Sequence, residues 1–127
     1  MIQINLQHSR GTSVLLEKLL ASETMNVARI QEPWLVGGKV SVLNNSRDKL
    51  TYNTNSGSPR TCIFINHDLN YLVLNEFCNR DITAVKLYYH TGAGAAKEVV
   101  MTSAYLLYDS PSPLPSEELV DLENFCR

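Results

Sequence analysis

Asn5 and Glu32 are polar residues placed where two short apolar segments end, and Tyr105 lies in a β-prone segment far along the chain. A carboxylate is the type of hard oxygen ligand that Mg²⁺ prefers, and a phenol can donate a hydrogen bond to a charged oxygen. An asparagine amide can orient a reacting group, although it cannot act as a base at neutral pH. Taken singly, each residue also has an ordinary explanation, as a solvated acid, a strand-end amide or a half-buried aromatic.

The elements before Pro33 predict a β-α-β unit. Apolar and polar residues alternate over residues 2–6, which is the pattern of a short strand with one buried face. Capping hydroxyls at Ser9–Thr12 and leucines at helical spacing predict an amphipathic helix over about residues 12–23. Val27–Ile30 predicts a second strand, which Pro33 ends, and the proline should also hold Glu32 in an extended conformation. Strands joined by a crossover helix run parallel, so both strand ends should lie at one edge of the sheet.

The rest of the chain predicts antiparallel hairpins that extend this sheet, followed by a helix. The β-prone segments, which are separated by turn residues, are Val40–Leu43, Arg60–Ile65, Tyr71–Leu74, Ile82–Tyr89 and Glu98–Tyr105. Ser116 is a suitable N-cap for a helix with Leu119, Leu122 and Phe125 on one face. We therefore expect one α/β (α+β) domain over residues 1–127, with a mixed, mostly antiparallel sheet. Its helices should lie on one face and leave the other face uncovered.

Charge is distributed unevenly along the chain. Residues 1–60 carry seven Lys or Arg and four Asp or Glu, a net charge of +3, whereas residues 61–127 carry four and nine, a net charge of −5. Affinity for the nucleic-acid backbone comes largely from Lys and Arg, so a chain of net charge −2 is a poor nonspecific binder. Any nucleic-acid site should therefore be a local patch of positive charge. Residues 1–60, which carry a net charge of +3, are the more favourable place for it.

The start of the chain predicts neither a signal peptide nor a membrane anchor, because apolar and polar residues alternate there. The longest apolar runs have the length of strands rather than of membrane spans. Cys62, Cys78 and Cys126 lack the spacing of a zinc site and fit reduced thiols. We expect a soluble intracellular protein that makes no membrane contact.

Four segments of the sequence, in this order and spacing, carry a resemblance. They are Ile4-Asn5-Leu6-Gln7, Ile30-Gln31-Glu32-Pro33, Pro59–Asn66 and Thr102–Ser110. Together they resemble the endonuclease/exonuclease/phosphatase superfamily. More closely, they are similar to the apurinic-type endonuclease domain at the start of jockey-like non-LTR retrotransposon polyproteins. The resemblance covers essentially all 127 residues.

The resemblance implies a four-layered α/β/β/α sandwich that hydrolyses one phosphodiester bond in DNA with Mg²⁺ or Mn²⁺. The nick would prime reverse transcription, which places the activity in the nucleus. On the family pattern, Glu32 binds the metal, Asn5 helps to position the metal or the attacking water, and Tyr105 contacts the scissile phosphate. Arg10 and Arg60 are further candidates for contact with DNA phosphate.

The sequence departs from the family pattern after Tyr105. The Asp-x-Asn motif that orients the water, a later aspartate and the closing Ser-Asp-His motif do not follow. His8, His67 and His90 are not at the position of the family's histidine. We therefore expect the N-terminal part of such a domain, inactive by itself, whether or not the reading frame continues beyond Arg127. The alternative is a noncatalytic module that binds a partner or itself through the uncovered sheet face.

Overall fold

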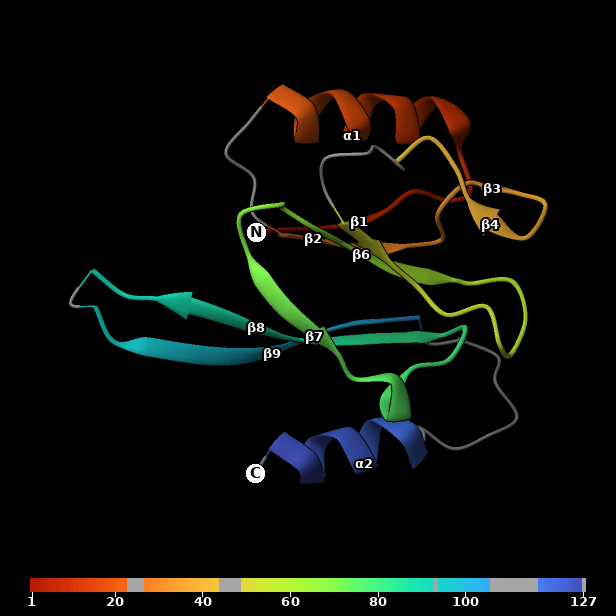
Figure 1. Cartoon of the computed structure of the whole chain (residues 1–127). Coiled ribbons are helices and arrows are strands. Elements are labelled where there is room, and N and C mark those ends of the chain that lie inside the picture. The colour runs from red at the N-terminus through yellow and green to blue at the C-terminus, as the bar shows by residue number, and fades with distance from the viewer. Residues whose placement is uncertain (23–26, 44–48, 93, 106–116, 127) are drawn as a thin grey trace.

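The structure is a computed structural model that describes residues 1–22, 27–43, 49–92, 94–105 and 117–126 (Figure 1). Its elements in chain order are β1 (Ile2–Asn5), α1 (Arg10–Ser22), β2 (Val27–Gln31), β3 (Leu35–Val36), β4 (Lys39–Val40), β5 (Lys49–Thr51), β6 (Thr61–Ile65), β7 (Asn70–Val73), the 3₁₀ turn η1 (Asn75–Phe77), β8 (Ile82–His90), β9 (Ala96–Ala104) and α2 (Glu117–Cys126).

The first sheet has the strand order β1-β2-β6-β5. β1 and β2 are parallel, with Asn5 opposite Gln31, which confirms the predicted β-α-β unit. β6 runs antiparallel to both β2 and β5. β3 and β4 form a separate small hairpin around Gly37 and Gly38, whose φ angles of 60° and 77° suit a tight turn that side chains disfavour.

The second sheet has the order β7-β8-β9 and is entirely antiparallel. The predicted segment Arg60–Ile65 therefore extends the first sheet as β6, whereas the predicted segments after it form a sheet of their own. The apolar run of β6 gives the physical reason. Cys62 and Phe64 pack toward α1, while Ile63 and Ile65 pack against Val85 and Leu87 of β8. A strand that is apolar on both sides needs a layer on each face.

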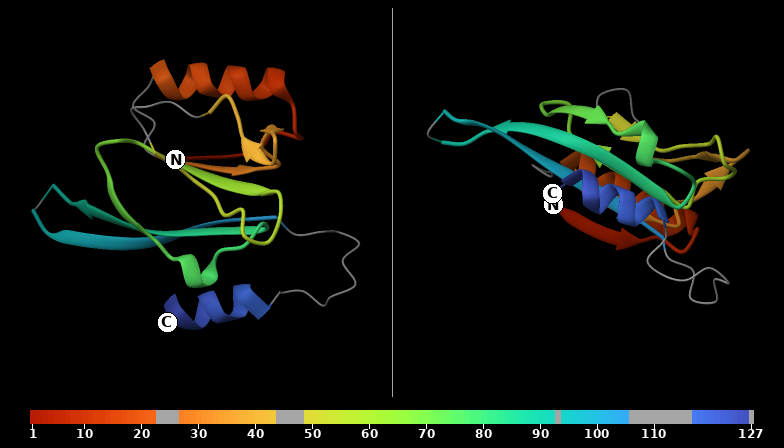
Figure 2. Two further views of the ribbon diagram at one scale, coloured as in Figure 1. Left: turned by 45° about the vertical axis from the view of Figure 1, so that its right-hand side comes forward. Right: turned by 90° about the horizontal axis from the view of Figure 1, so that it is seen from below.

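The molecule has four layers, α1, the first sheet, the second sheet and α2, which Figures 1 and 2 show from three directions. The α/β class and the four-layered sandwich are thus confirmed. The helices, however, lie on opposite outer faces, so the prediction that they share one face was wrong. The predicted uncovered face carries α2, where Leu122 is buried against Leu74 and Ala84. Leu72 and Tyr88, farther along that sheet, stay exposed.

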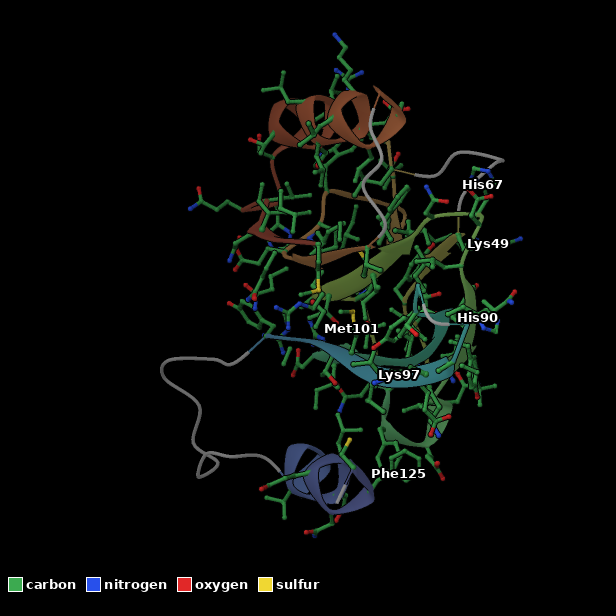
Figure 3. The ribbon with its side chains drawn as sticks, turned by 90° about the vertical axis from the view of Figure 1, so that its left-hand side faces the viewer. Lys49, His67, His90, Lys97, Met101 and Phe125 are labelled. Carbon is green, nitrogen blue, oxygen red and sulfur yellow. The ribbon has the colours of Figure 1, made fainter. Side chains whose placement is uncertain are left out.

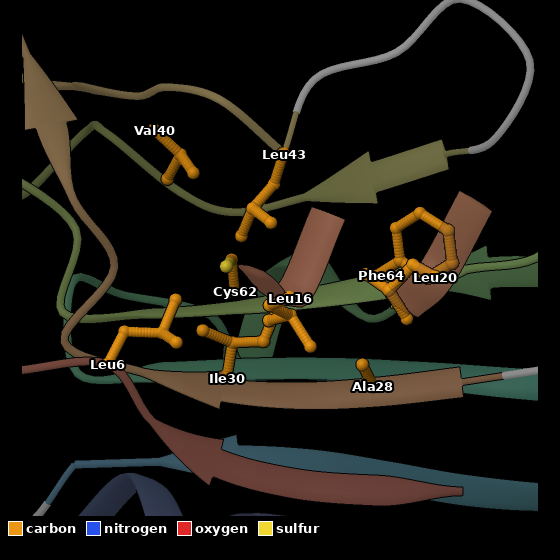
Figure 4. Packing of buried hydrophobic residues seen from close by; sticks show 9 residues of the cluster. All are labelled: Leu6, Leu16, Leu20, Ala28, Ile30, Val40, Leu43, Cys62 and Phe64. Atoms are coloured by element: carbon orange, nitrogen blue, oxygen red, sulfur yellow. The ribbon is translucent and has the colours of Figure 1, made fainter. Parts of the chain in front are cut away.

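The start of helix α1 is fixed by an N-cap, and fewer of its leucines are buried than the sequence predicted. The Ser9 hydroxyl accepts a hydrogen bond from the amide of Thr12 at 3.2 Å, so the helix starts at Arg10, two residues early. Leu16 and Leu20 are buried in the core shown in Figure 4, whereas Leu15 is 69% exposed. The pattern of four leucines thus identified the helix but overstated its buried face.

Some further predictions need correction, and others lie outside the described residues. Val40–Leu43 is not a strand, because β4 ends at Val40 and Val42 has a φ of 75°, which no strand allows. Ser116, residues 106–110 and the side chain of Leu119 lie outside the described residues. Neither described helix is long and apolar enough to cross a membrane.

Candidate active site at the ends of β1 and β2

Asn5 and Glu32 lie at one edge of the first sheet, as the parallel pairing of β1 and β2 requires. Asn5 is the last residue of β1 and is directly opposite Gln31, the last residue of β2, so Glu32 follows at the same edge. The amide of Glu32 donates a hydrogen bond to the carbonyl of Arg60 at 2.8 Å, which fixes its backbone to the start of β6. The structure thus brings together the two residues for which the sequence predicted metal binding.

The backbone at this edge is left-handed at three residues that are not glycine. Gln7, His8 and Glu32 have φ angles of 51°, 56° and 48°. Glu32 therefore does not have the extended conformation that Pro33 predicts. The amide of Gln7 donates to Oδ1 of Asn5 at 2.8 Å, and the amide of His8 donates to the carbonyl of Glu32 at 2.9 Å. These hydrogen bonds hold a conformation that costs on the order of 1 kcal/mol or more at each residue, a kind of strain that often marks functional sites.

Tyr105 reaches the same edge from the second sheet, directly after β9. Its phenol donates a hydrogen bond to the carboxylate of Glu32. Its own amide donates to the carbonyl of Asp81 at 2.8 Å. All three predicted catalytic residues, Asn5, Glu32 and Tyr105, thus meet at one end of the sandwich.

Small polar side chains join the two sheets beside this site. The hydroxyls of Thr61 and Thr83 share a buried hydrogen bond of 2.9 Å, and Ser103 donates to the carbonyl of Ile30 at 2.9 Å. The side-chain amide of Gln31 donates to the carbonyl of Ala104. Small hydroxyl residues let the sheets approach closely here, whereas Ile63, Ile65 and Leu87 separate them elsewhere. This close approach lets a residue after β9 touch a residue after β2.

The surroundings of Tyr105 favour its protonated form. The hydrogen bond to Glu32 raises the pKa of Tyr105 above its ordinary value of 10. Partial burial and the negative charges of Glu32 and Asp81 act in the same direction, while the positive charge of Arg60 opposes them.

Arg60, a predicted DNA-binding residue, makes its contacts inside the protein. Its Nε lies 2.6 Å from Oδ1 of Asp81, and its Nη2 donates to Oδ2 at 3.2 Å. Its guanidinium carbon lies 5.0 Å from the centre of the Tyr105 ring. Sequence reasoning missed Asp81, although opposite charges directly before β6 and β8 were a usable signal.

Arg10, the other predicted DNA-binding residue, is exposed at the start of α1 on the same side of the molecule. Its guanidinium carbon lies 5.7 Å from the centre of the Trp34 ring. His8 is near as well, since its Nδ1 is 3.0 Å from the carbonyl of Pro33. A cation and an aromatic ring therefore border the edge that carries Glu32.

Other basic side chains lie at the opposite end of the strands. Figure 3 shows this end, with Lys49, His67, His90 and Lys97 labelled. Lys49 pairs with Ile65 at the far end of β6, and His90 lies at the tip of the β8–β9 hairpin. These groups are remote from Glu32.

The donor atoms at the edge fit a hard divalent cation. Glu32 offers a carboxylate and Asn5 an amide oxygen, and Mg²⁺ is commonly held by one or two carboxylates while it keeps several waters. Among the described residues, no group of three or more His, Cys, Asp or Glu is placed to hold a metal. The residues thus suit a cation that shares its coordination with water and phosphate more than an enclosed metal site.

Among the comparisons with known proteins, the one with solved structures supports the fold. No protein-family model and no curated protein matches the sequence. Among solved structures, the chain is similar to the endonuclease domain of TRAS1, a telomere-specific non-LTR retrotransposon, with a TM-score of 0.71 and 22% sequence identity. The match covers 99% of this chain and 53% of that structure. The chain therefore has the fold of about half of that endonuclease domain.

Proposed function

We propose that this chain forms the metal- and phosphate-binding part of a divalent-metal-dependent DNA endonuclease that nicks target DNA for reverse transcription in a non-LTR retrotransposon. The expected metal is Mg²⁺ or Mn²⁺, the substrate is duplex DNA, and the place of action is the nucleus. The jockey-like assignment, which rests on the sequence motifs, is part of this proposal.

The observation that carries the proposal is the contact between Glu32 and Tyr105 at the edge where Asn5 also lies. A carboxylate, an amide and a phenol from three separate segments converge there, and the backbone of Glu32 is left-handed. An ordinary ion pair or turn does not require a carboxylate, an amide and a phenol at one place. The similarity to a retrotransposon endonuclease domain supports it further.

Each residue has a distinct part in the proposed reaction. Glu32 holds the cation, and Asn5, whose Oδ1 already accepts the amide of Gln7, orients water or the cation beside it. Tyr105 donates a hydrogen bond to a nonbridging oxygen of the scissile phosphate. The cation, when bound, stabilises negative charge on the phosphate and on the leaving oxygen. Arg10 is free to approach the DNA backbone from the start of α1.

We expect the 127-residue chain by itself to hydrolyse DNA weakly or not at all. The motifs that would activate the water do not follow Tyr105 in this sequence, and a carboxylate that binds metal does not replace them. Nicking of supercoiled plasmid measures this directly. Robust Mg²⁺-dependent nicking that Glu32→Ala abolishes would show that the chain is active and would contradict this part of the proposal.

Metal-dependent DNA binding tests the main part of the proposal. Fluorescence anisotropy of a short labelled duplex should show binding that Mg²⁺ strengthens, and Glu32→Gln should weaken the metal-dependent affinity by about tenfold or more. Glu98→Gln is a matched control, because Glu98 lies on β9 and pairs with Lys86 at 3.7 Å. Equal affinity of the wild type and Glu32→Gln in Mg²⁺ would overturn the proposal.

The alternative, a noncatalytic module that binds through an uncovered sheet face, has less support, because α2 covers part of that face, although Leu72 and Tyr88 stay exposed farther along the sheet. Helix α2 packs on that face through Leu122, and the rings of Phe125 and Phe77 are in tilted contact with their centres 5.0 Å apart. No described contact favours association with a second copy.

A further inference from the structure

We propose that Arg60 and Asp81 are positioning residues, whose ion pair holds the phenol of Tyr105 against Glu32. The importance of this arrangement for catalysis rests on the proposed nuclease function, whereas the arrangement itself does not. The two residues occupy equivalent places, Arg60 directly before β6 in the first sheet and Asp81 directly before β8 in the second. Their side chains therefore bridge the two sheets.

Each member of the pair is also bound to one residue of the site through the backbone. The carbonyl of Arg60 accepts the amide of Glu32 at 2.8 Å, and the carbonyl of Asp81 accepts the amide of Tyr105 at 2.8 Å. The ion pair thus closes a ring of contacts that runs from Glu32 through Arg60 and Asp81 to Tyr105. A relative shift of the sheets at this end would have to break it.

The contact of Arg60 with the tyrosine ring fixes the side chain as well as the backbone. An arginine can place one face of its planar guanidinium over an aromatic ring and use its edge for a carboxylate. Arg60 does both, with Asp81 at its edge and the Tyr105 ring 5.0 Å from its guanidinium carbon. A lysine carries the same charge but cannot make both planar contacts.

This role differs from the DNA contact that the sequence predicted for Arg60. The Arg60 side chain is only 19% exposed, and its charge is already paired with a carboxylate. Two of its three guanidinium nitrogens, Nε and Nη2, face Asp81. Arg10, which is exposed, remains available for that contact.

The neighbouring loops hold the pair in place. The amide of Arg60 donates to the carbonyl of Arg80, and the amide of Arg80 donates to the hydroxyl of Ser56 at 2.8 Å. The side-chain amide oxygen of Asn79 accepts the amide of Asp81 at 2.7 Å. The segment before β6 and the turn before β8 therefore form one unit, and the ion pair lies on its side that faces Tyr105.

The test uses the 127-residue chain free of metal and DNA, so its result does not depend on nuclease function. NMR of ¹³C-labelled tyrosine, with Tyr105→Phe to assign the signals, reports the position of the Tyr105 ring. The ¹⁵N signal of Arg60 Nε–H reports the ion pair. Asp81→Asn should move the Tyr105 ring signals and the ¹⁵N signal of Arg60 Nε, because the negative charge 2.6 Å from that nitrogen is lost.

Two further variants separate positioning from a general loss of structure. Arg60→Lys keeps the charge but not the planar contacts, so the Tyr105 signals should move while the thermal unfolding midpoint stays close to that of the wild type. Glu98→Gln breaks the Lys86–Glu98 ion pair on the outer part of β9 and should leave the Tyr105 signals unchanged.

The outcomes are distinguishable. If Arg60→Lys is folded and leaves the Tyr105 ring signals unchanged, the positioning role is overturned. If the signals move as expected but Glu32 does not affect metal-dependent DNA binding, the positioning role stands and the proposed function fails. If Asp81→Asn unfolds the chain, the result with Arg60→Lys decides.

Discussion

Glu32 and Tyr105, which follow strands of different sheets, are joined by a hydrogen bond from the phenol to the carboxylate. The parallel pairing of β1 and β2 places Asn5 at the same edge. The contact therefore links the β-α-β unit that the sequence predicted to the last strand of the second sheet. Asn5, Glu32 and Tyr105, which are far apart in the sequence, therefore lie at the same end of the molecule.

The titration of Tyr105 should depend on Glu32. The hydrogen bond and the negative charge of Glu32 both favour the neutral phenol, so Glu32→Gln should lower the pKa of Tyr105 toward its ordinary value of 10. A pH titration of ¹³C-tyrosine signals in metal-free protein measures this, and Tyr88, which is exposed on the outer face of β8, serves as an internal reference. A pKa for Tyr105 that does not change in Glu32→Gln would contradict the contact.

The same shift determines the sign of a pH effect on stability. The pKa of Tyr105 is higher in the folded chain than in the unfolded chain. Its contribution to the free energy of unfolding is therefore fully present below the unfolded value, near 10, and is lost as the pH rises through the raised folded value. Urea unfolding at several alkaline pH values should show a smaller loss of stability in Tyr105→Phe than in the wild type.

The hydroxyls of Thr61 and Thr83, which share a buried hydrogen bond between the sheets, should affect the free energy of unfolding non-additively. Thr61→Val leaves the hydroxyl of Thr83 with only a 3.4 Å contact to the carbonyl of residue 61, so the free energy of unfolding should fall by about 1–2 kcal/mol. In the double variant with Thr83→Val no hydroxyl is left unpaired, and the loss should be smaller than the sum of the two single losses. Urea unfolding of the four proteins measures the coupling, and simple additivity would show that the pair contributes little.

The two faces of helix α1 should differ sharply in their response to mutation. Leu16 is 3% exposed and lies in the core of Figure 4, so Leu16→Ala should lower the free energy of unfolding by about 2–5 kcal/mol. Leu15 is 69% exposed, and Leu15→Ala should change it by about 0.5 kcal/mol or less. The two substitutions remove the same atoms from adjacent residues, so equal effects would mean that the helix faces the sheet differently.

The sequence predicted the local elements better than their assembly. The alternation at residues 2–6, the leucines of α1 and the proline after β2 are local signals, and the β-α-β unit follows from them. The division into two sheets depends on contacts between segments far apart in sequence, such as Ile63 with Val85, which periodicity does not reveal. The prediction of one sheet with helices on one face failed for that reason.

The candidate site was predictable to a similar degree. Asn5 and Glu32 share an edge because of the crossover connection, which sequence alone implies. The place of Tyr105 beside them followed only from the resemblance, since β9 belongs to the other sheet. The pairing of Arg60 with Asp81 and the left-handed backbone of Glu32 are visible only in the structure, because both are fixed by neighbours from other strands.

We expect a divalent cation to bind at Glu32, beside Asn5 and Tyr105. Paramagnetic Mn²⁺ added to ¹⁵N-labelled chain tests it most directly, because the ion broadens the signals of nearby amides. Substoichiometric Mn²⁺ should broaden the signals of Asn5, Glu32 and Tyr105 first, excess Mg²⁺ should reverse the broadening, and Glu32→Gln should abolish it. Broadening centred elsewhere, or unchanged in Glu32→Gln, would contradict cation binding at Glu32.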